Sequence, residues 1–149
     1  MLSKNYLVRI LPELEEVHDT GTQVLEGEGY DGILEVLQNL RSVEFPAFVL
    51  EDKTSGAISL VEGPVDNYSQ SIWVMCREGR DDNGAEIYSK ALHICYRLLA
   101  LLLKHYRDND AELSGWNYSR ISYMRRRGGQ DCRGWELVLS FSDNFSMLQ

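Results

Sequence analysis

Three glycines at positions 27, 29 and 32 form the one pattern in this chain that is commonly associated with cofactor chemistry. Residues 27–32 read Gly-Glu-Gly-Tyr-Asp-Gly and match G-x-G-x-x-G, which binds dinucleotides where it joins a buried strand to a helix. Glu51 and Asp52 follow about 20 residues later, where an acidic residue would contact a ribose. The pattern therefore raises the possibility of a nucleotide site.

Three features of the surrounding sequence oppose such a site. Residues 20–26 make a poor buried strand, and Glu26, Glu28 and Asp31 would set carboxylates against a pyrophosphate at the start of the next helix. The chain after Asp52 predicts a hairpin, whereas a dinucleotide fold needs a second crossover helix. We therefore expect a glycine-rich loop and no cofactor, and keep a nucleotide-binding enzyme as a remote alternative.

Other residues with catalytic potential show no useful spacing. His18, His93 and His105 have no metal-ligand spacing, and the serines include no G-x-S-x-G. The three cysteines, Cys76, Cys95 and Cys132, include no C-x-x-C, so neither a zinc site nor a disulfide framework is indicated. We predict no catalytic residues and no metal, although two carboxylates distant in sequence could still meet in space.

The strongest basic cluster consists of Arg125, Arg126 and Arg127, with Arg133 across a turn that contains Gly128 and Gly129. It is either an ordinary solvated hairpin or an arm that grips an acidic surface. Trp73 belongs to a set of aromatic residues on the last three predicted strands, and it packs either in the core or against another subunit. These four arginines and Trp73 are our predicted interface residues.

Charge is unevenly distributed along the chain. The net charge is -8; residues 1–75 carry 4 basic and 13 acidic residues, and residues 76–149 carry 11 and 10. An acidic chain does not bind nucleic acid backbones in general. The acidic half and the arginine cluster are either solvated surface or complementary contact surfaces.

The elements that must position these residues follow from hydrophobic periodicity. Residues 82–106 predict a long helix capped by Asn83, with a buried stripe at positions 87, 91, 94, 95, 98, 99 and 102. Residues 2–17 and 31–42 predict two further helices, the first beginning or kinking at Pro12. Residues 18–30 are expected to be a loop.

Five strands are predicted at residues 45–51, 57–62, 70–77, 117–127 and 133–142. The first two are expected to form a hairpin around residues 54–56. The chain thus predicts one α+β domain, residues 1–149, in which an antiparallel sheet of about five strands carries one long helix, in the order α-α-βββ-α-ββ. Residues 91–103 are too short and too polar to span a membrane, and no signal peptide is seen, so a cytoplasmic protein is expected.

The order of elements, together with the segments FPAFVLED, SQSIWVMCRE, IYSKALHICYRLLALLLKHY, ISYMRRR and WELVLSFS, resembles the tail-terminator and tail-completion proteins at the neck of long-tailed bacteriophages. This resemblance covers about two-thirds of the chain and implies a structural subunit without enzymatic activity. It implies assembly of a phage or prophage protein into a ring in the host cytoplasm, with contacts to other tail or head-neck proteins. It implies neither a membrane partner nor sequence-specific binding to nucleic acid.

The same order of elements and the isoelectric point near 4.8 also resemble bacterial secretion chaperones. Those proteins are acidic homodimers that hold an unfolded segment on exposed apolar patches. The chain departs from them because no helix is predicted after Phe141.

Overall fold

The computed structural model describes residues 1–41, 44–52, 55–77, 84–128 and 132–145. The helices are α1 (Lys4–Ile10), α2 (Thr20–Gln23), α3 (Gly29–Gln38) and α4 (Gly84–Arg107), with short 3-10 turns η1 (Leu11–Glu13) and η3 (Ala111–Leu113). The strands are β1 (Val24–Gly27), β2 (Ala47–Glu51), β3 (Gly56–Ser59), β4 (Val65–Arg77), β5 (Ser122–Arg127) and β6 (Cys132–Asn144).

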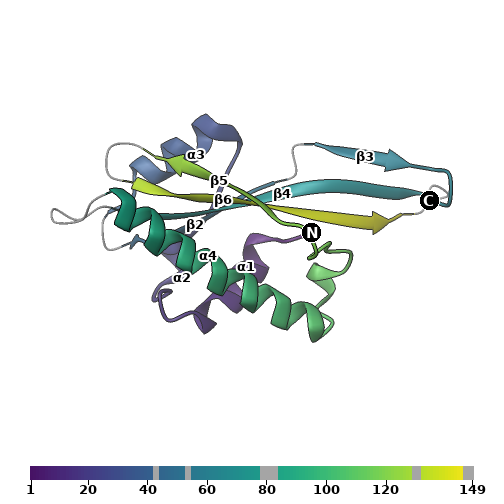
Figure 1. Cartoon of the computed structure of the whole chain (residues 1–149), viewed down its shortest axis with the longest axis horizontal. Coiled ribbons are helices and arrows are strands. Elements are labelled where there is room, and N and C mark those ends of the chain that lie inside the picture. Colours follow the sequence, from purple (N-terminus) through teal and green to yellow (C-terminus); the bar gives the residue numbers. More distant parts are fainter. Residues whose placement is uncertain (42–43, 53–54, 78–83, 129–131, 146–149) are drawn as a thin grey trace.

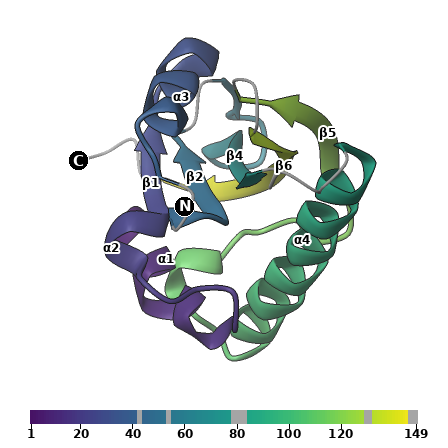
Figure 2. The same ribbon diagram turned by 90° about the vertical axis from the view of Figure 1, so that its left-hand side faces the viewer.

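All six strands belong to one sheet in the order β1-β2-β4-β6-β5. β3 pairs with residues 65–68 of β4, next to the part of β4 that pairs with β2. β1 runs parallel to β2, and the other pairs are antiparallel. Helices α1 and α4 lie on one face, which we call the α4 face, and α3 lies on the other, the α3 face (Figures 1 and 2). The α+β fold with one long helix is therefore confirmed, and the sheet is mixed.

The α4 face holds the main core. Ile87, Ala91, Cys95, Leu98 and Leu102 of α4 are buried, because they fall three or four positions apart and so form one stripe. They pack against the apolar face of the two central strands, which consists of Ile72 and Val74 on β4 and Leu137, Leu139 and Phe141 on β6. The strand predicted at residues 133–142 is therefore confirmed as part of β6, whose apolar residues alternate along the chain.

A second, smaller core lies on the α3 face. Ile33 and Leu37 of α3 pack over Val49, Trp73 and Met75, and all five are at most 2% exposed. β4 carries buried apolar residues on both faces, because it is an inner strand between β2 and β6 with a core on each side. The predicted helix at residues 31–42 is confirmed, although it begins at Gly29 and ends at Gln38.

The loop predicted at residues 18–30 was wrong. It contains α2, which is capped by the Asp19 side chain, and β1, whose Val24 is fully buried. The predicted hairpin between the first two strands was also wrong, since β3 pairs with β4 and β2 lies between β1 and β4. The physical reason is burial: residues 47–50 of β2 are all buried, whereas every residue of β3 is exposed.

The N-terminal helix is shorter than predicted. α1 ends at Ile10, and Pro12 stands in the first turn of η1, so the predicted break at the proline is confirmed. β4 begins at Val65, five residues earlier than expected, and β5 begins at Ser122, five residues later. Asn83, the predicted cap of α4, lies outside the described residues.

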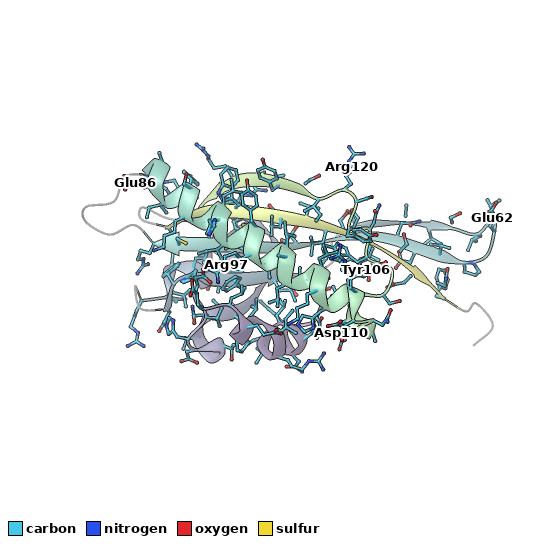
Figure 3. All side chains as sticks on the ribbon, turned by 60° about the horizontal axis from the view of Figure 1, so that its bottom comes forward. Glu62, Glu86, Arg97, Tyr106, Asp110 and Arg120 are labelled. Carbon is cyan, nitrogen blue, oxygen red and sulfur yellow. The ribbon has the colours of Figure 1, made fainter. Side chains whose placement is uncertain are left out.

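One end of the sheet projects beyond the helices. It consists of β3 with the adjoining parts of β4 and β6, residues 56–69 and 140–144, which we call the β arm (Figure 1). Glu62 lies at its end (Figure 3). Within the described ranges, no helix is both long enough and apolar enough to cross a membrane.

Candidate functional site

The predicted arginine cluster lies on β5, an edge strand, and at the start of β6. Neighbouring residues of a strand point to opposite faces, so the cluster is divided between the two faces of the sheet. Arg125, Arg127 and Arg133 lie on the α4 face, because Arg125 pairs with Trp135 and Arg127 with Arg133 in the β5–β6 register. Arg126 lies on the α3 face, so the four arginines do not form one surface. The alternation of a strand was the signal that could have shown this from the sequence.

Arg125 is exposed and held by aromatic rings. Its guanidinium carbon lies 4.2 Å from the ring centroid of Tyr88 and 5.5 Å from that of Trp135. The Trp135 indole N–H donates to the Tyr88 carbonyl oxygen at 2.8 Å, which fixes the two rings relative to each other. A cation–π contact uses the face of the guanidinium, and therefore leaves its N–H groups available for an acidic partner.

Arg126 forms an ion pair with Glu136 of the same chain. Its Nε and Nη2 lie 2.8 Å and 2.7 Å from Oε1 of Glu136, which is only 7% exposed. The Ser71 hydroxyl donates to the other oxygen of Glu136 at 2.6 Å. The Arg126 guanidinium also lies 5.1 Å from the Trp73 ring centroid. This residue thus anchors β5 to the sheet.

Trp73 lies in the second core cluster and is 2% exposed. Tyr30, which is 50% exposed, lies over it with the ring centroids 5.9 Å apart. A partner protein approaching this face would meet Tyr30 and Arg126 before Trp73. The core alternative for Trp73 therefore describes this structure, and its contact with another subunit stays a prediction.

The glycine motif has a more regular setting than its sequence suggested. β1, α3 and β2 form a β-α-β unit in which the motif joins the first strand to the helix, so the argument that no strand precedes it was wrong. A Cβ on Gly27 would lie 2.7 Å from Cγ1 of Ile33, and Gly29 has φ +69°. Gly27 therefore permits close packing of strand and helix, and Gly29 permits the turn.

The position where a phosphate would bind is nevertheless taken by a carboxylate. The backbone N–H of Gly29, at the start of α3, donates to the side chain of Glu51. Burial and the neighbouring Glu136 raise the pKa of Glu51, while this N–H opposes that shift. A phosphate at the same N–H would have to displace Glu51 and approach the carboxylate of Glu136.

A cavity of about 530 Å³ opens at the carboxyl ends of β1 and β2. Its lining includes the acidic residues Glu26, Glu28 and Asp52, together with Lys4 and Met1. Its apolar part comes from Leu2, Val36 and Leu50. The cavity is large enough for a small ligand or for side chains of another protein, and its acidic wall favours a cationic group.

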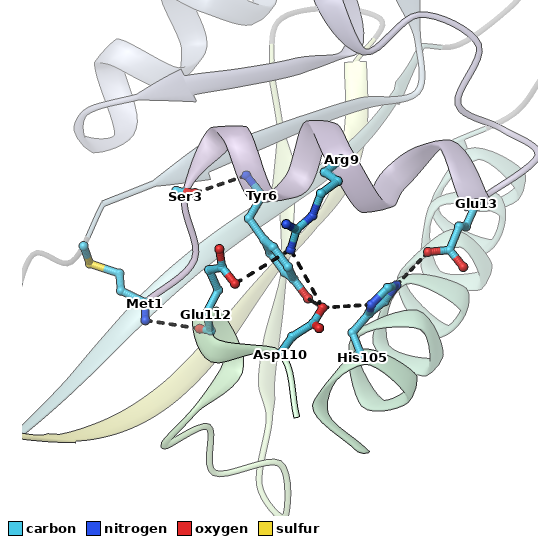
Figure 4. A network of polar contacts seen from close by, with 8 residues as sticks. All are labelled: Met1, Ser3, Tyr6, Arg9, Glu13, His105, Asp110 and Glu112. Atoms are coloured by element: carbon cyan, nitrogen blue, oxygen red, sulfur yellow. Dashed lines mark hydrogen bonds and ion pairs between the residues drawn. The ribbon is translucent and has the colours of Figure 1, made fainter. Parts of the chain in front are cut away.

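His105 belongs to a polar network that ties α1 to the end of α4 (Figure 4). Its Nε2 lies 2.6 Å from Glu13 and its Nδ1 lies 2.9 Å from Asp110, which also accepts a hydrogen bond from the Tyr6 hydroxyl at 2.8 Å. Hydrogen bonding by Tyr6 lowers the pKa of Asp110, and hydrogen bonding by Lys104 and then His105 lowers that of Glu13. These contacts join α1 and η1 to the end of α4, and Asp110 also lines a cavity of about 470 Å³ there.

The three cysteines are buried. Burial raises the pKa of Cys76 to about 11 and those of Cys95 and Cys132 to about 12, so their thiols stay protonated and poorly nucleophilic at neutral pH. In the described part of the chain, no three His, Cys, Asp or Glu side chains are placed to hold a metal ion.

The end of the β arm exposes apolar side chains that sequence reasoning missed. Ile58 is 65% exposed, Leu60 55% and Val61 92%. Their clustering beside the Gly63-Pro64 turn was a usable signal, because three apolar residues in a short hairpin tip have no core to enter.

Comparison of the sequence with protein-family models gave no match, and comparison with curated proteins gave none either.

Proposed function

We propose that this chain is a structural assembly protein without enzymatic activity, one subunit of a ring at the head-proximal end of a phage or prophage tail. The observation that carries this proposal is the β arm. It extends from one end of the molecule and presents Ile58, Leu60 and Val61 to solvent, where an isolated chain gains nothing from them. A neighbouring subunit would cover these side chains.

The position of the arm favours head-to-tail assembly. When an arm at one end of a molecule binds a different surface on the next molecule, the contact is heterologous, and such contacts close into rings when the rotation between subunits allows it. The resemblance to tail-terminator and tail-completion proteins supplies the biological setting: a homo-oligomer that forms in the host cytoplasm, joins the virion, and contacts other tail or head-neck proteins.

Light scattering across a concentration series, with electron microscopy of the largest species, tests this proposal. We expect ring-sized particles, or a monomer that associates steeply as its concentration rises. Val61→Asp should shift association to about tenfold higher concentration, because it places a charge in the covered tip. Glu62→Gln, at the adjoining position, is the matched control and should assemble normally. A chain that stays monomeric at all concentrations contradicts the proposal.

A second candidate is an acidic dimeric binding protein similar to secretion chaperones. An apolar groove of about 180 Å³ lies beside α4, and its walls include Leu99, Leu103, Trp116, Tyr118 and Ile121. Such a groove could hold an apolar peptide segment. β6 extends to Asn144, and no helix follows Phe141 within the described residues, which is unlike those chaperones. A tight dimer at every concentration, with bound peptide, would favour this candidate.

A nucleotide-binding enzyme remains the remote alternative. The β-α-β unit favours it, and the Glu51 carboxylate at the start of α3 opposes it. Titration with ATP and with NAD, monitored through intrinsic fluorescence, tests for a nucleotide site. We expect no saturable signal. Saturable binding that Gly29→Ala abolishes while the variant stays folded would establish a nucleotide site and favour this candidate instead.

A further inference from the structure

Two concentrations of charge lie at opposite edges of the sheet. Residues 24–52, the β1-α3-β2 unit, hold seven acidic residues and one arginine, a net charge of -6. Residues 120–133, around β5, hold five arginines and one aspartate, a net charge of +4. β1 and β5 are the two ends of the strand order, and Figure 2 shows them on opposite sides of the molecule.

Within one chain Arg126 lies near enough to Glu51 to oppose the rise that burial causes in its pKa, whereas the exposed charges at β1 and at β5 lie far apart. Four strand spacings of about 4.8 Å separate β1 from β5, roughly 19 Å, which exceeds the screening length of about 8 Å at physiological salt. Each edge also presents its charges to solvent. On one side these are the exposed carboxylates of Glu26, Glu28, Asp31, Glu35 and Asp52, which we call the acidic edge; on the other, Arg120, Arg125 and Arg127 are exposed and form the basic edge.

The acidic edge contains the 530 Å³ cavity, with Glu26, Glu28 and Asp52 in its wall and apolar surface from Leu2 and Leu50. A guanidinium suits such a cavity, since its flat faces contact apolar groups while its edge donates to carboxylates. On the basic edge, Arg125 is held in place by Tyr88 and Trp135 through its face. It is therefore already positioned to donate, and loses little conformational freedom on binding.

We propose that the acidic edge of one copy of this chain binds the basic edge of the next, with Arg125 entering the cavity beside Glu26. The proposal rests on the proposed function, because it presupposes an assembly of identical subunits. It names a second contact in that assembly, separate from the β arm. Because the two edges are different surfaces on opposite sides of the sheet, the contact is head-to-tail and repeats from subunit to subunit.

Charge exchange tests this contact. Arg125→Glu and Glu26→Lys should each raise the protein concentration needed for assembly by about tenfold or more, because each sets like charges together. The double variant should return it to within about threefold of wild type, since the pair is restored with its polarity reversed. Arg107→Glu, exposed at the end of α4 and outside both edges, is the matched control and should assemble normally.

The outcomes separate this contact from the ring itself. Wild-type protein that assembles, together with single variants that assemble equally well, would overturn the edge contact and leave the ring proposal standing. Failure of the double variant to recover, with circular dichroism unchanged, would also overturn it. Wild-type protein that stays monomeric would overturn both.

Discussion

Arg126 and Arg125 are neighbours in sequence but should differ greatly in their effect on folding stability. Removing Arg126 leaves Glu136, 7% exposed, with Ser71 as its remaining hydrogen-bond partner, and an incompletely paired buried carboxylate is costly. We expect Arg126→Gln to lower the free energy of unfolding by about 1–3 kcal/mol. Arg125→Gln, which loses only contacts with aromatic faces, should lower it by less than about 1 kcal/mol. Urea unfolding measures both, and equal effects would contradict the assignment of Arg126 to an internal pair.

The network around Asp110 should make stability depend on pH in the acidic range. The folded chain lowers the pKa of Asp110 below its ordinary 3.8 and that of Glu13 below its ordinary 4.5. A lowered pKa means that folding favours the ionised carboxylate. The stabilisation is therefore complete at pH values above the ordinary pKa and is lost as the pH falls through the lower pKa of the folded chain. We expect the melting temperature to be level from pH 7 to about 5 and to fall below about 4.

Asp110→Asn is the variant that checks this assignment. It should lower the melting temperature at pH 7 by roughly 2–4 °C and shrink the difference between pH 6 and pH 3, because one of the titrating carboxylates is gone. Asp108→Asn, at an exposed position two residues away, is the control. An unchanged pH profile in Asp110→Asn would show that the acid sensitivity arises elsewhere.

At the scale of elements, the glycines of the β-α-β unit should respond in opposite directions to alanine. A Cβ on Gly27 would lie 2.7 Å from Ile33 and force α3 away from β1, so Gly27→Ala should destabilise the protein by about 1–3 kcal/mol. Gly32 lies within α3, and a Cβ there would meet no other atom within 4 Å, so Gly32→Ala should stabilise the protein by about 0.5–1 kcal/mol. Thermal unfolding of both variants checks this, and destabilisation by Gly32→Ala would contradict the packing described.

Long, strongly periodic elements could be predicted from the sequence, and short ones could not. α4, with its repeated apolar stripe, extends over Gly84–Arg107 against a predicted 82–106. β1 was missed because it has only four residues, including Glu26 and Gly27, and is a strand through its pairing with β2. The first five residues of β4 were missed for a similar reason: Asp66, Asn67 and Ser69 are polar, and Tyr68 is the one residue of the five that is buried.

The candidate site was predictable in its composition but not in its geometry. The arginine run and the acidic first half are visible in the sequence, whereas their placement at opposite sheet edges depends on the strand order β1-β2-β4-β6-β5. That order places β1 beside β2 at one edge of the sheet and β5 at the other edge. It depends on which residues far apart in the sequence are buried together. The pairing of Arg126 with Glu136 likewise needed the β5–β6 register, which the hydrogen bond from the Gly128 N–H to the Cys132 carbonyl oxygen continues beyond the Arg127–Arg133 pair.

At the scale of the whole molecule, salt should separate the two contacts that we propose. Ion pairs between the acidic and basic edges weaken as the screening length falls from about 10 Å at 0.1 M salt to about 3 Å at 1 M. Burial of Ile58, Leu60 and Val61 does not weaken in this way, and excluded salts strengthen it. We therefore expect assembly to weaken between 0.1 and about 0.5 M sodium chloride in the wild type.

The Arg125→Glu variant should show little further weakening over the same range, because its edge contact is already lost, while Val61→Asp should keep the full salt dependence of the wild type. Light scattering at fixed protein concentration measures all three. If wild-type assembly instead strengthened steadily with sodium chloride, apolar burial would dominate both surfaces, and the charge separation across the sheet would serve solubility rather than assembly.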